Sequence, residues 1–418
     1  MSEDAPRPPL FTPAFFTMCG FSFTVFLSAF LLLPTAPLHI LSLGGSSLAA
    51  GSFLGLLTYA SAFTAPLTGA LADRLGRRRT LVTCSLVLAV FAGGYAVAGT
   101  PRTMLVLALA QGLFWSGLLS ASAAYITGVI PESRRAEGIG YWGLSTMLAI
   151  AVAPNIGLWL YAQGWRWLCA IAGALNLLMA GIAWVLVEQP RSATSDRFFT
   201  RRLLEWRVLL ASVTLFLYSF GYGGVTSFVA LYAKTSGVSP PGLYFTALSI
   251  AVLLTRPFCV PLADRFGHRR VLLPCFVLMS AGLGVLALGG TRTTLVASAV
   301  VFGGGFGTAY PVFAAYVTRR VEPLRRGAAF GAILAAFDTG IGTGSISAGW
   351  IIGHSGFRAA YATAAGLAAL ALPYFLYIDR KLLDRQRAPD SLRRARRGGE
   401  RECARGGADD RHPPVLLE

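Results

Sequence analysis

One segment occurs twice in this chain, first as Gly69-Ala70-Leu71-Ala72-Asp73-Arg74-Leu75-Gly76-Arg77-Arg78-Arg79 and then as Pro261-Leu262-Ala263-Asp264-Arg265-Phe266-Gly267-His268-Arg269-Arg270. Asp264 follows Asp73 by 191 residues, and the same offset places 123–127 (AAYIT) on 314–318 (AAYVT) and Gly140 on Gly331. Two similar segments at one fixed offset indicate an internal duplication. Because both copies lie between long apolar runs, they predict a membrane bundle made of two related halves.

Composition also places the chain in a membrane. Of 418 residues, 55% are hydrophobic and 13% charged, and the mean hydropathy is +0.60. These values are too apolar for a soluble protein of this length. A helix needs about 20 apolar residues to cross the hydrocarbon, and we expect twelve such spans, near residues 12–33, 47–70, 80–99, 103–126, 139–160, 167–187, 208–232, 243–263, 271–290, 294–317, 328–352 and 357–378.

The expected fold is therefore an all-α integral membrane protein with two pseudo-symmetric six-helix bundles. We assign 1–187 to the N-terminal bundle, 188–207 to a cytoplasmic linker, 208–378 to the C-terminal bundle and 379–418 to a disordered, basic cytoplasmic tail. The linker carries arginine, phenylalanine and leucine together, so it can lie at the cytoplasmic interface as a short amphipathic helix.

The basic residues lie mainly in alternate loops. The net charge is +17, and the loops after spans 2, 4, 6, 8 and 10 hold 18 lysines and arginines against 5 in the odd-numbered loops. By the positive-inside rule, both termini are expected in the cytoplasm, with the protein in the inner membrane of a bacterium. This distribution favours a lipid bilayer over nucleic acid as the partner of the basic residues.

The cysteines and histidines show no pattern of a cofactor site. The six cysteines have no paired spacing, and the four histidines, in loops and tail, form no cluster. We therefore expect no metal, no cofactor and no catalytic residues. The expected partners are a small-molecule substrate, protons and the bilayer, and the chain is expected to be a monomer.

The duplicated segment resembles the signature loop of the major facilitator superfamily of secondary transporters. That loop is matched by Gly69, Asp73, Arg74, Gly76 and Arg77, and its weaker copy by Asp264, Arg265, Gly267 and Arg269. The resemblance covers all twelve expected spans. It implies that the loop aspartate latches the cytoplasmic side while the two halves work by alternating access. A purely topogenic arginine cluster is the alternative, but it explains neither the aspartate nor its recurrence.

Spans 5 and 11 resemble a degenerate form of the glycine-proline pattern that exporters of this family carry. The positions concerned are Pro154 and Gly157 in span 5 and Gly340 and Gly344 in span 11. A proline inside a span loosens the helix where a neighbour satisfies the freed carbonyl, so these residues are candidates for flexing; simple packing is the alternative. Span 4 departs from the family, because Ala108 precedes Gln111-Gly112 where many proton-coupled exporters carry an arginine.

Only two ionisable side chains fall well inside the expected spans. They are Arg256 in span 8 and Asp338 in span 11, at similar depths. Charges at a helix centre cost at least about 2.5–3.5 kcal/mol and are normally functional. We expect the two to form a buried pair or to face one cavity, with Asp338 the carboxylate whose protonation is coupled to transport. A static ion pair bracing spans 8 and 11 is the alternative.

Other polar and aromatic side chains are candidates for a substrate cleft between the halves. In the family, spans 1, 4, 7 and 10 surround the substrate, which adds Thr24, Ser28 and Thr226 to the main candidates Gln111, Trp115, Asn155, Tyr218 and Tyr222. With few charges, such a cleft suits an amphiphilic or apolar solute better than a polyanion.

Export of a small organic, drug-like or metabolite molecule by proton antiport is the expected function. Uptake or facilitated diffusion of a sugar or organic acid stays open, because the arginine of span 4 is missing. A membrane-embedded lipid enzyme or a sensor is a more distant alternative. The chain shows no constellation of nucleophile, acid and base, so we do not expect an enzyme.

Overall fold

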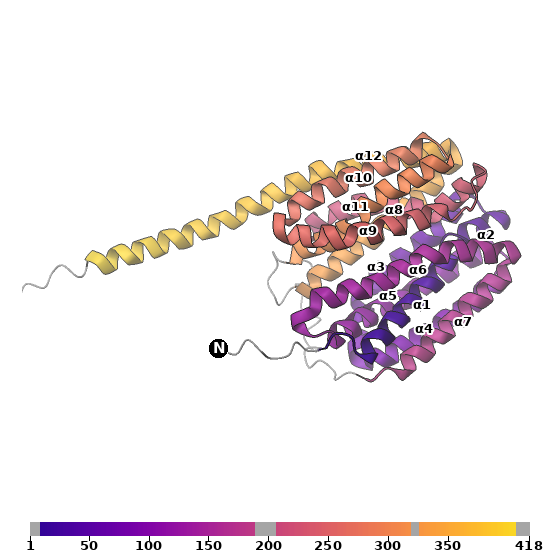
Figure 1. Cartoon of the computed structure of the whole chain (residues 1–418), viewed down its shortest axis with the longest axis horizontal. Helices are drawn as coiled ribbons and strands as arrows, with labels where there is room; N and C mark the ends of the chain where they lie inside the picture. Colours follow the sequence, from indigo (N-terminus) through magenta and orange to yellow (C-terminus); the bar gives the residue numbers. More distant parts are fainter. Residues whose placement is uncertain (1–8, 189–205, 319–325, 407–418) are drawn as a thin grey trace, which may run out of the picture. The chain divides into compact units, whose positions relative to one another are not determined.

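The computed structural model describes residues 9–188, 206–318 and 326–406, and apart from turns and short connections these residues are helical (Figure 1). The first half contains seven α-helices and one 3-10 turn: α1 (Pro13–Leu32), α2 (Ala36–Ser42), α3 (Ser47–Leu75), α4 (Arg77–Val97), α5 (Pro101–Val129), η1 (Glu132–Arg134), α6 (Arg135–Gln163) and α7 (Trp165–Val185). Within this half α3 packs on α5, α4 on α7 and α1 on α6. The short helix α2 lies in what we expected to be a loop.

The second half repeats this arrangement. It contains α8 (Trp206–Thr235), α9 (Leu243–Phe266), α10 (His268–Leu288), α11 (Arg292–Thr318) and α12 (Arg326–Gly406). Here α9 packs on α11, as α3 packs on α5 in the first half. The long element α12 contains two helices joined at Gly356, whose φ of 79° breaks the helical backbone.

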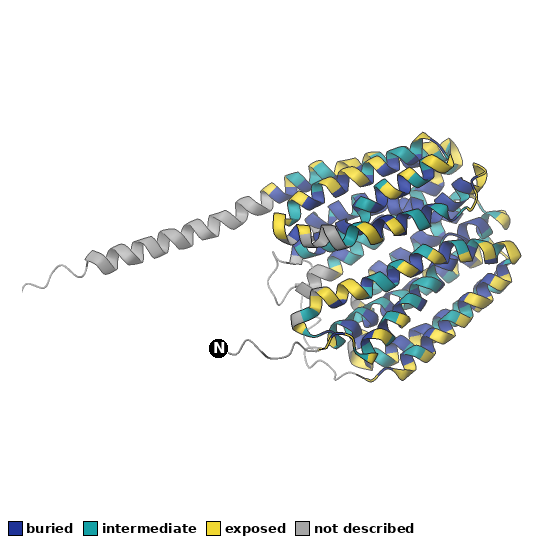
Figure 2. Ribbon diagram, in the orientation of Figure 1, coloured by how far each residue is buried: buried dark blue, intermediate teal, exposed yellow. Residues whose placement is uncertain are grey.

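Ten helices of the described chain are long and apolar enough to cross a membrane. An eleventh apolar helix, Leu243–Arg256, is shorter, and one of the ten, Gly331–Arg380, contains the break at Gly356. The all-α membrane fold is thus confirmed. Large apolar side chains lie exposed along the outer faces of these helices, among them Val90 and Phe63, which are 74% and 78% exposed (Figure 2). Such positions suit contact with lipid tails rather than with water.

The duplication is visible in backbone geometry. Gly76 joins α3 to α4 with φ 101°, and Gly267 joins α9 to α10 with φ 91°. Each glycine N–H also bonds back to the preceding helix, from Gly76 to Ala72 O at 3.0 Å and from Gly267 to Ala263 O at 3.1 Å. Only glycine adopts such positive φ values without strain, so the glycines of both signature copies are explained by the turn between helices.

Helix starts and helix crossings repeat at the same 191-residue offset. The Thr100 hydroxyl caps α5 by accepting from Thr103 N at 3.2 Å, and the Thr291 hydroxyl caps α11 by accepting from Thr294 N at 3.2 Å. Helix α5 crosses α3 where Gly112 faces Leu57 and Ala60, and α11 crosses α9 where Gly303 faces Leu248 and Ala251. A Cβ added to either glycine would contact atoms of these residues. The two halves therefore share packing as well as sequence.

Many hydroxyls inside the helices are satisfied by their own backbone. Thr58 Oγ1 donates to Leu54 O at 3.0 Å, and Thr255 Oγ1 donates to Ala251 O at 2.8 Å. This pattern satisfies the hydroxyl inside the helix, where lipid offers no partner.

The C-terminal end differs from our expectation. Residues 379–418 were predicted to be disordered, but the helical backbone of α12 continues to Gly406. Residues 379–406 are rich in arginine and also contain alanine and leucine, which favour helices, and this preference outweighed the compositional argument for disorder. Residues 407–418 lie outside the described residues, as do 189–205, which include most of the predicted linker.

Candidate functional site

The two halves meet along two antiparallel helix pairs, α3 with α12 and α6 with α9. In the first pair the Ser345 hydroxyl donates to Gly51 O at 2.7 Å, and Tyr59 OH lies 2.8 Å from Thr343 Oγ1. The helices approach closely because Gly51 and Gly55 lack a Cβ atom. A Cβ at either position would collide with atoms of α12. These contacts lie on the side of the bundle that is farther from the Gly76 and Gly267 turns.

Asp338 lies in the α3/α12 pair and bonds to the other half of the molecule. Its Oδ2 accepts a hydrogen bond from Ser61 Oγ at 3.1 Å. The Asp338 side chain is half-buried and the Ser61 side chain is buried. Tyr310 of α11 lies within electrostatic range of the same carboxylate. Within the described chain this is the hydrogen bond that the Asp338 carboxylate accepts, and one hydroxyl satisfies only part of a carboxylate's capacity as an acceptor.

Arg256 lies in the other pair, α6 with α9. Its guanidinium nitrogens are 3.0 and 3.1 Å from the point where a Cβ would stand on Gly143. Within the described residues no ion pair within 4.0 Å joins Arg256 to Asp338. The two charges thus make separate contacts across the interface, and the static-pair alternative finds no support there. Whether they face one cavity stays a prediction.

Two of the cleft candidates join an aromatic cluster in the second half. The Tyr222 ring stacks on Phe306 with 4.3 Å between centroids, and Tyr218 stands edge-on to Phe306 at 6.2 Å. Phe337, next to Asp338 in the chain, lies 6.1 Å from Tyr218 and 5.1 Å from Tyr310. The Tyr218 hydroxyl is buried and has no hydrogen-bond partner in the described part of the chain. This cluster lies against the part of α12 that carries Asp338 and contains one buried hydroxyl without a hydrogen-bond partner in the described chain.

The remaining cleft candidates are occupied by contacts within the protein. Gln111 accepts from Tyr95 OH at 2.6 Å, Trp115 packs edge-on to Phe26, and Asn155 Nδ2 donates to Thr246 Oγ1 at 2.6 Å across the α6/α9 pair. The further candidates bond within their own half: Thr24 to Gly20 O, Thr226 to Tyr222 O, and Ser28 to Asn176 Oδ1. Packing accounts for most of these contacts, but the Asn155 Oδ1 atom is buried without a hydrogen-bond partner in the described chain. A role of these side chains in binding stays a prediction.

The signature loops hold their helices together through arginines. Arg77 donates to Ala124 O of α5 at 2.9 Å, and Arg78 donates to Trp184 O of α7 at 2.6 Å. In the second copy the Arg265 guanidinium lies over the Phe266 ring at 5.5 Å. The side chains of Asp73 and Asp264 lie outside the described part, so their predicted latching role is untested. Arg74 is exposed, and Arg269 lies in the first turn of α10.

The proposed flexing residues lie at close helix crossings. A Cβ on Gly157 would stand 2.6 Å from Leu31 O of α1, and a Cβ on Gly340 would stand 2.6 Å from Phe216 O of α8. Gly344 similarly touches the Phe220 backbone, and Pro154 is buried inside α6. Packing thus explains the glycines, and flexing stays a prediction.

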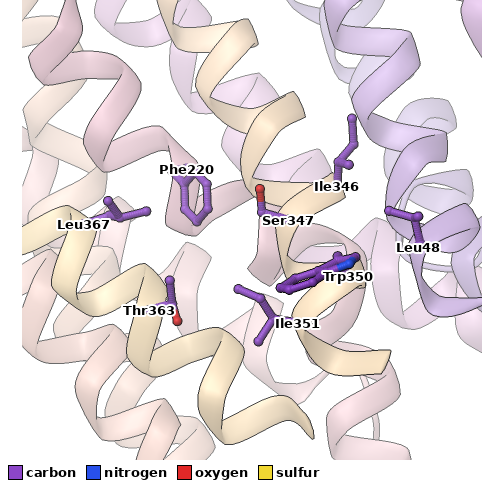
Figure 3. Close-up of a pocket in the computed structure, with 8 residues that line it drawn as sticks. All are labelled: Leu48, Phe220, Ile346, Ser347, Trp350, Ile351, Thr363 and Leu367. Atoms are coloured by element: carbon purple, nitrogen blue, oxygen red, sulfur yellow. The ribbon is translucent and has the colours of Figure 1, made fainter. Parts of the chain in front are cut away.

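A separate apolar groove opens on the surface of the bundle (Figure 3). Its volume is about 490 Å³, and Phe220 of α8 and Trp350 of α12 are among the side chains that line it. Figure 3 also shows Leu48 of α3 at its edge and Thr363 and Leu367 from the part of α12 after Gly356. None of the described residues that line the groove is ionisable, so it lacks the chemistry of the two charged positions. No group of metal-ligating residues occurs in the described chain either.

Comparisons with known proteins agree with this architecture. Residues 18–244 and 212–406 each match the family profile described as Major Facilitator Superfamily. An uncharacterized MFS-type transporter of Burkholderia pseudomallei (strain 1106a) is 26% identical over 374 residues, which cover 86% of this chain and 91% of that protein. The MFS-type transporter YhhS of Escherichia coli (strain K12) is 26% identical over 368 residues, covering 84% and 89%.

Solved structures share the fold at lower identity. The nucleoside transporter NupG aligns with a TM-score of 0.70 and 18% identity over 88% of this chain and 99% of its own. A bacterial homolog of the human lysosomal transporter Spinster, inward-facing and unoccupied, aligns with a TM-score of 0.73 and 16% identity over 90% and 98%. At these identities the likeness concerns the fold alone.

Proposed function

This chain belongs to the major facilitator superfamily, and on that premise we propose that it exports a small organic molecule in exchange for protons. Membership makes it a multi-pass membrane transporter and not an enzyme. In the proposed mechanism the halves rock against each other and open the space between them to each side of the membrane in turn. The twelve-span topology, cytoplasmic termini, inner-membrane location and monomeric state are parts of the same proposal.

One observation carries the proton coupling. Asp338 is a carboxylate inside a membrane span, and its hydrogen-bond partner Ser61 belongs to the other half. When the halves separate along α3 and α12, the carboxylate loses that donor, and its affinity for a proton must change. Tyr310 of α11 also lies within electrostatic range of the carboxylate. Opening of the halves and protonation of Asp338 are thereby linked.

Proton movement in everted vesicles tests the proposal without knowledge of the substrate. Vesicles that contain the transporter are acidified inside, a pH-sensitive dye reports the gradient, and a chemically diverse panel of solutes is added one by one. We expect at least one solute to discharge the gradient with the wild-type chain and not with Asp338→Asn. Glu137→Gln is the matched control, since it neutralises an exposed carboxylate paired with Arg134.

Two results would speak against the proposal. Undiminished solute-driven proton movement in Asp338→Asn would remove this residue from coupling. Solute flux that does not depend on the pH gradient would instead favour facilitated diffusion of a sugar or organic acid, the second candidate. That candidate is supported by Ala108, which stands where many proton-coupled exporters of the family carry an arginine.

A further inference from the structure

Arg256 is a cation inside the bundle without an observed protein partner. Among the described residues no hydrogen bond or ion pair engages its guanidinium, although the side chain is half-buried. An arginine offers five N–H donors and stays charged at any physiological pH. A charge at membrane depth with unused donors is costly, so such a residue normally serves a ligand or an ion path.

A glycine faces the Arg256 guanidinium across the interface. The guanidinium lies against Gly143 of α6, where a Cβ would stand 3.0 to 3.2 Å from it and would force it to shift by a few tenths of an ångström. Gly143 is held in place by its neighbour Trp142, whose indole N–H donates to Ser22 Oγ at 2.6 Å. The contact between α6 and α9 at Arg256 is therefore made by a glycine.

The depth of Arg256 indicates what kind of anion can reach it. It precedes Asp264, which lies near the end of α9, by eight residues, or about 12 Å along the helix. A lipid phosphate held at the headgroup level is too far away for direct contact. A soluble anion that enters between the halves can reach this depth. Asp338 does not compete for the guanidinium, because no ion pair within 4.0 Å joins them in the described chain.

We propose that Arg256 binds the anionic group of the transported molecule, which is therefore an organic monoanion such as a carboxylate. This inference rests on the proposed function, since it places the ligand in the path between the halves. The planar guanidinium forms two parallel hydrogen bonds to a carboxylate, which a lysine cannot reproduce. The glycine at position 143 leaves the guanidinium free to present its N–H groups to the ligand.

Matched pairs of acids and amides test the charge requirement on purified protein in neutral detergent. The probes are benzoate and 2-naphthoate against benzamide and 2-naphthamide, at constant ionic strength, with thermal unfolding as the readout. Ligands that bind the folded state raise its apparent stability. We expect the acids and not the amides to stabilise the wild type, and Arg256→Gln to weaken acid binding at least tenfold. Arg292→Gln, which removes an exposed arginine from the start of α11, is expected to bind like the wild type.

Two further variants guard against misfolding as the explanation. Arg256→Lys keeps the charge and is expected to bind the acids several-fold more weakly than wild type. Gly143→Ala keeps Arg256 but places a methyl against its guanidinium, and is also expected to weaken acid binding. Equal stabilisation by acids and amides, or unchanged acid binding in Arg256→Gln, would overturn the proposal.

The source of the anion and the mechanism of coupling are tested separately. Stabilisation of wild type over Arg256→Gln by phosphatidylglycerol, with no effect of the acids, would assign the site to a lipid and overturn the proposal. Because binding is measured without a membrane gradient, a failure of proton-driven export in vesicles leaves this result intact. Likewise, loss of acid binding does not bear on the role of Asp338.

Discussion

The paired glycine crossings of the two halves allow a prediction with an internal control. Gly112 and Gly303 occupy equivalent positions 191 residues apart, and each touches the helix beside it. In Gly112→Ala the new methyl would stand 2.7 Å from the Ala60 methyl, and in Gly303→Ala it would stand 3.0 Å from the Ala251 methyl and 2.8 Å from Leu248 O. All three distances are shorter than van der Waals contact, so the helices must separate.

Overpacking of this kind costs about 1–3 kcal/mol, while alanine in place of glycine gains about 0.5–1 kcal/mol in helix propensity. We therefore expect both variants to lose about 1–2 kcal/mol of unfolding free energy, with the larger loss for Gly112→Ala. Equilibrium unfolding by titration of a denaturing detergent into mixed micelles measures these free energies.

The matched controls are the equivalent pair Gly93 in α4 and Gly284 in α10. In the described chain, neither has an atom from outside its own stretch of helix within 4 Å of its Cβ position. Their alanine variants are expected to equal or exceed wild-type stability by up to about 1 kcal/mol, because only the propensity gain applies. If Gly112→Ala and Gly303→Ala were as stable as these controls, the crossings would be looser than the structure shows, and the shared packing of the halves would be refuted.

Three further predictions concern single interactions. A double-mutant cycle of Ser61→Ala and Asp338→Asn should give a coupling energy of about 0.6–1.7 kcal/mol, the range of interhelical bonds in membranes; a value near zero would mean that the bond is absent in micelles. Thr100→Ala and Thr291→Ala each remove an N-cap and should each cost about 1 kcal/mol in the same titration, and unequal costs would contradict their equivalence. Gly76→Ala places a side chain at φ 101° and should cost about 1–3 kcal/mol, seen as a lower thermal midpoint; an unchanged midpoint would show that this turn relaxes freely.

Much of the architecture could be predicted because it depends on periodic and local signals. Hydropathy located the helices, and the recurrence of an Asp-Arg-x-Gly segment located the turns at Gly76 and Gly267, where positive φ requires glycine. The break at Gly356 also lies within the short gap between the last two expected spans. At the C-terminal end, local composition predicts disorder, whereas the backbone is helical to Gly406.

The partners of the two charged residues could not be predicted, because they depend on contacts between distant segments. Ser61 bonds to a residue 277 positions away, and nothing local distinguishes it from the hydroxyls that bond to their own helix. Gly143 likewise has no sequence signal that points to Arg256. Equal depth suggested a pair of Arg256 with Asp338, but depth does not tell which side of a helix a residue occupies. Aromatic residues were more informative, since Tyr218 and Tyr222 do lie together around Phe306.

The contacts of the two charges have a consequence for how the protein can be assembled. Asp338 and Arg256 both belong to the second half, and the residues they touch, Ser61 and Gly143, both belong to the first. A chain severed between α7 and α8 would give two fragments, one with both charges and one with both of their contact residues. Reassociation of the fragments would then be required before either charge regained its surroundings, so complementation by co-expressed fragments would report directly on this interface.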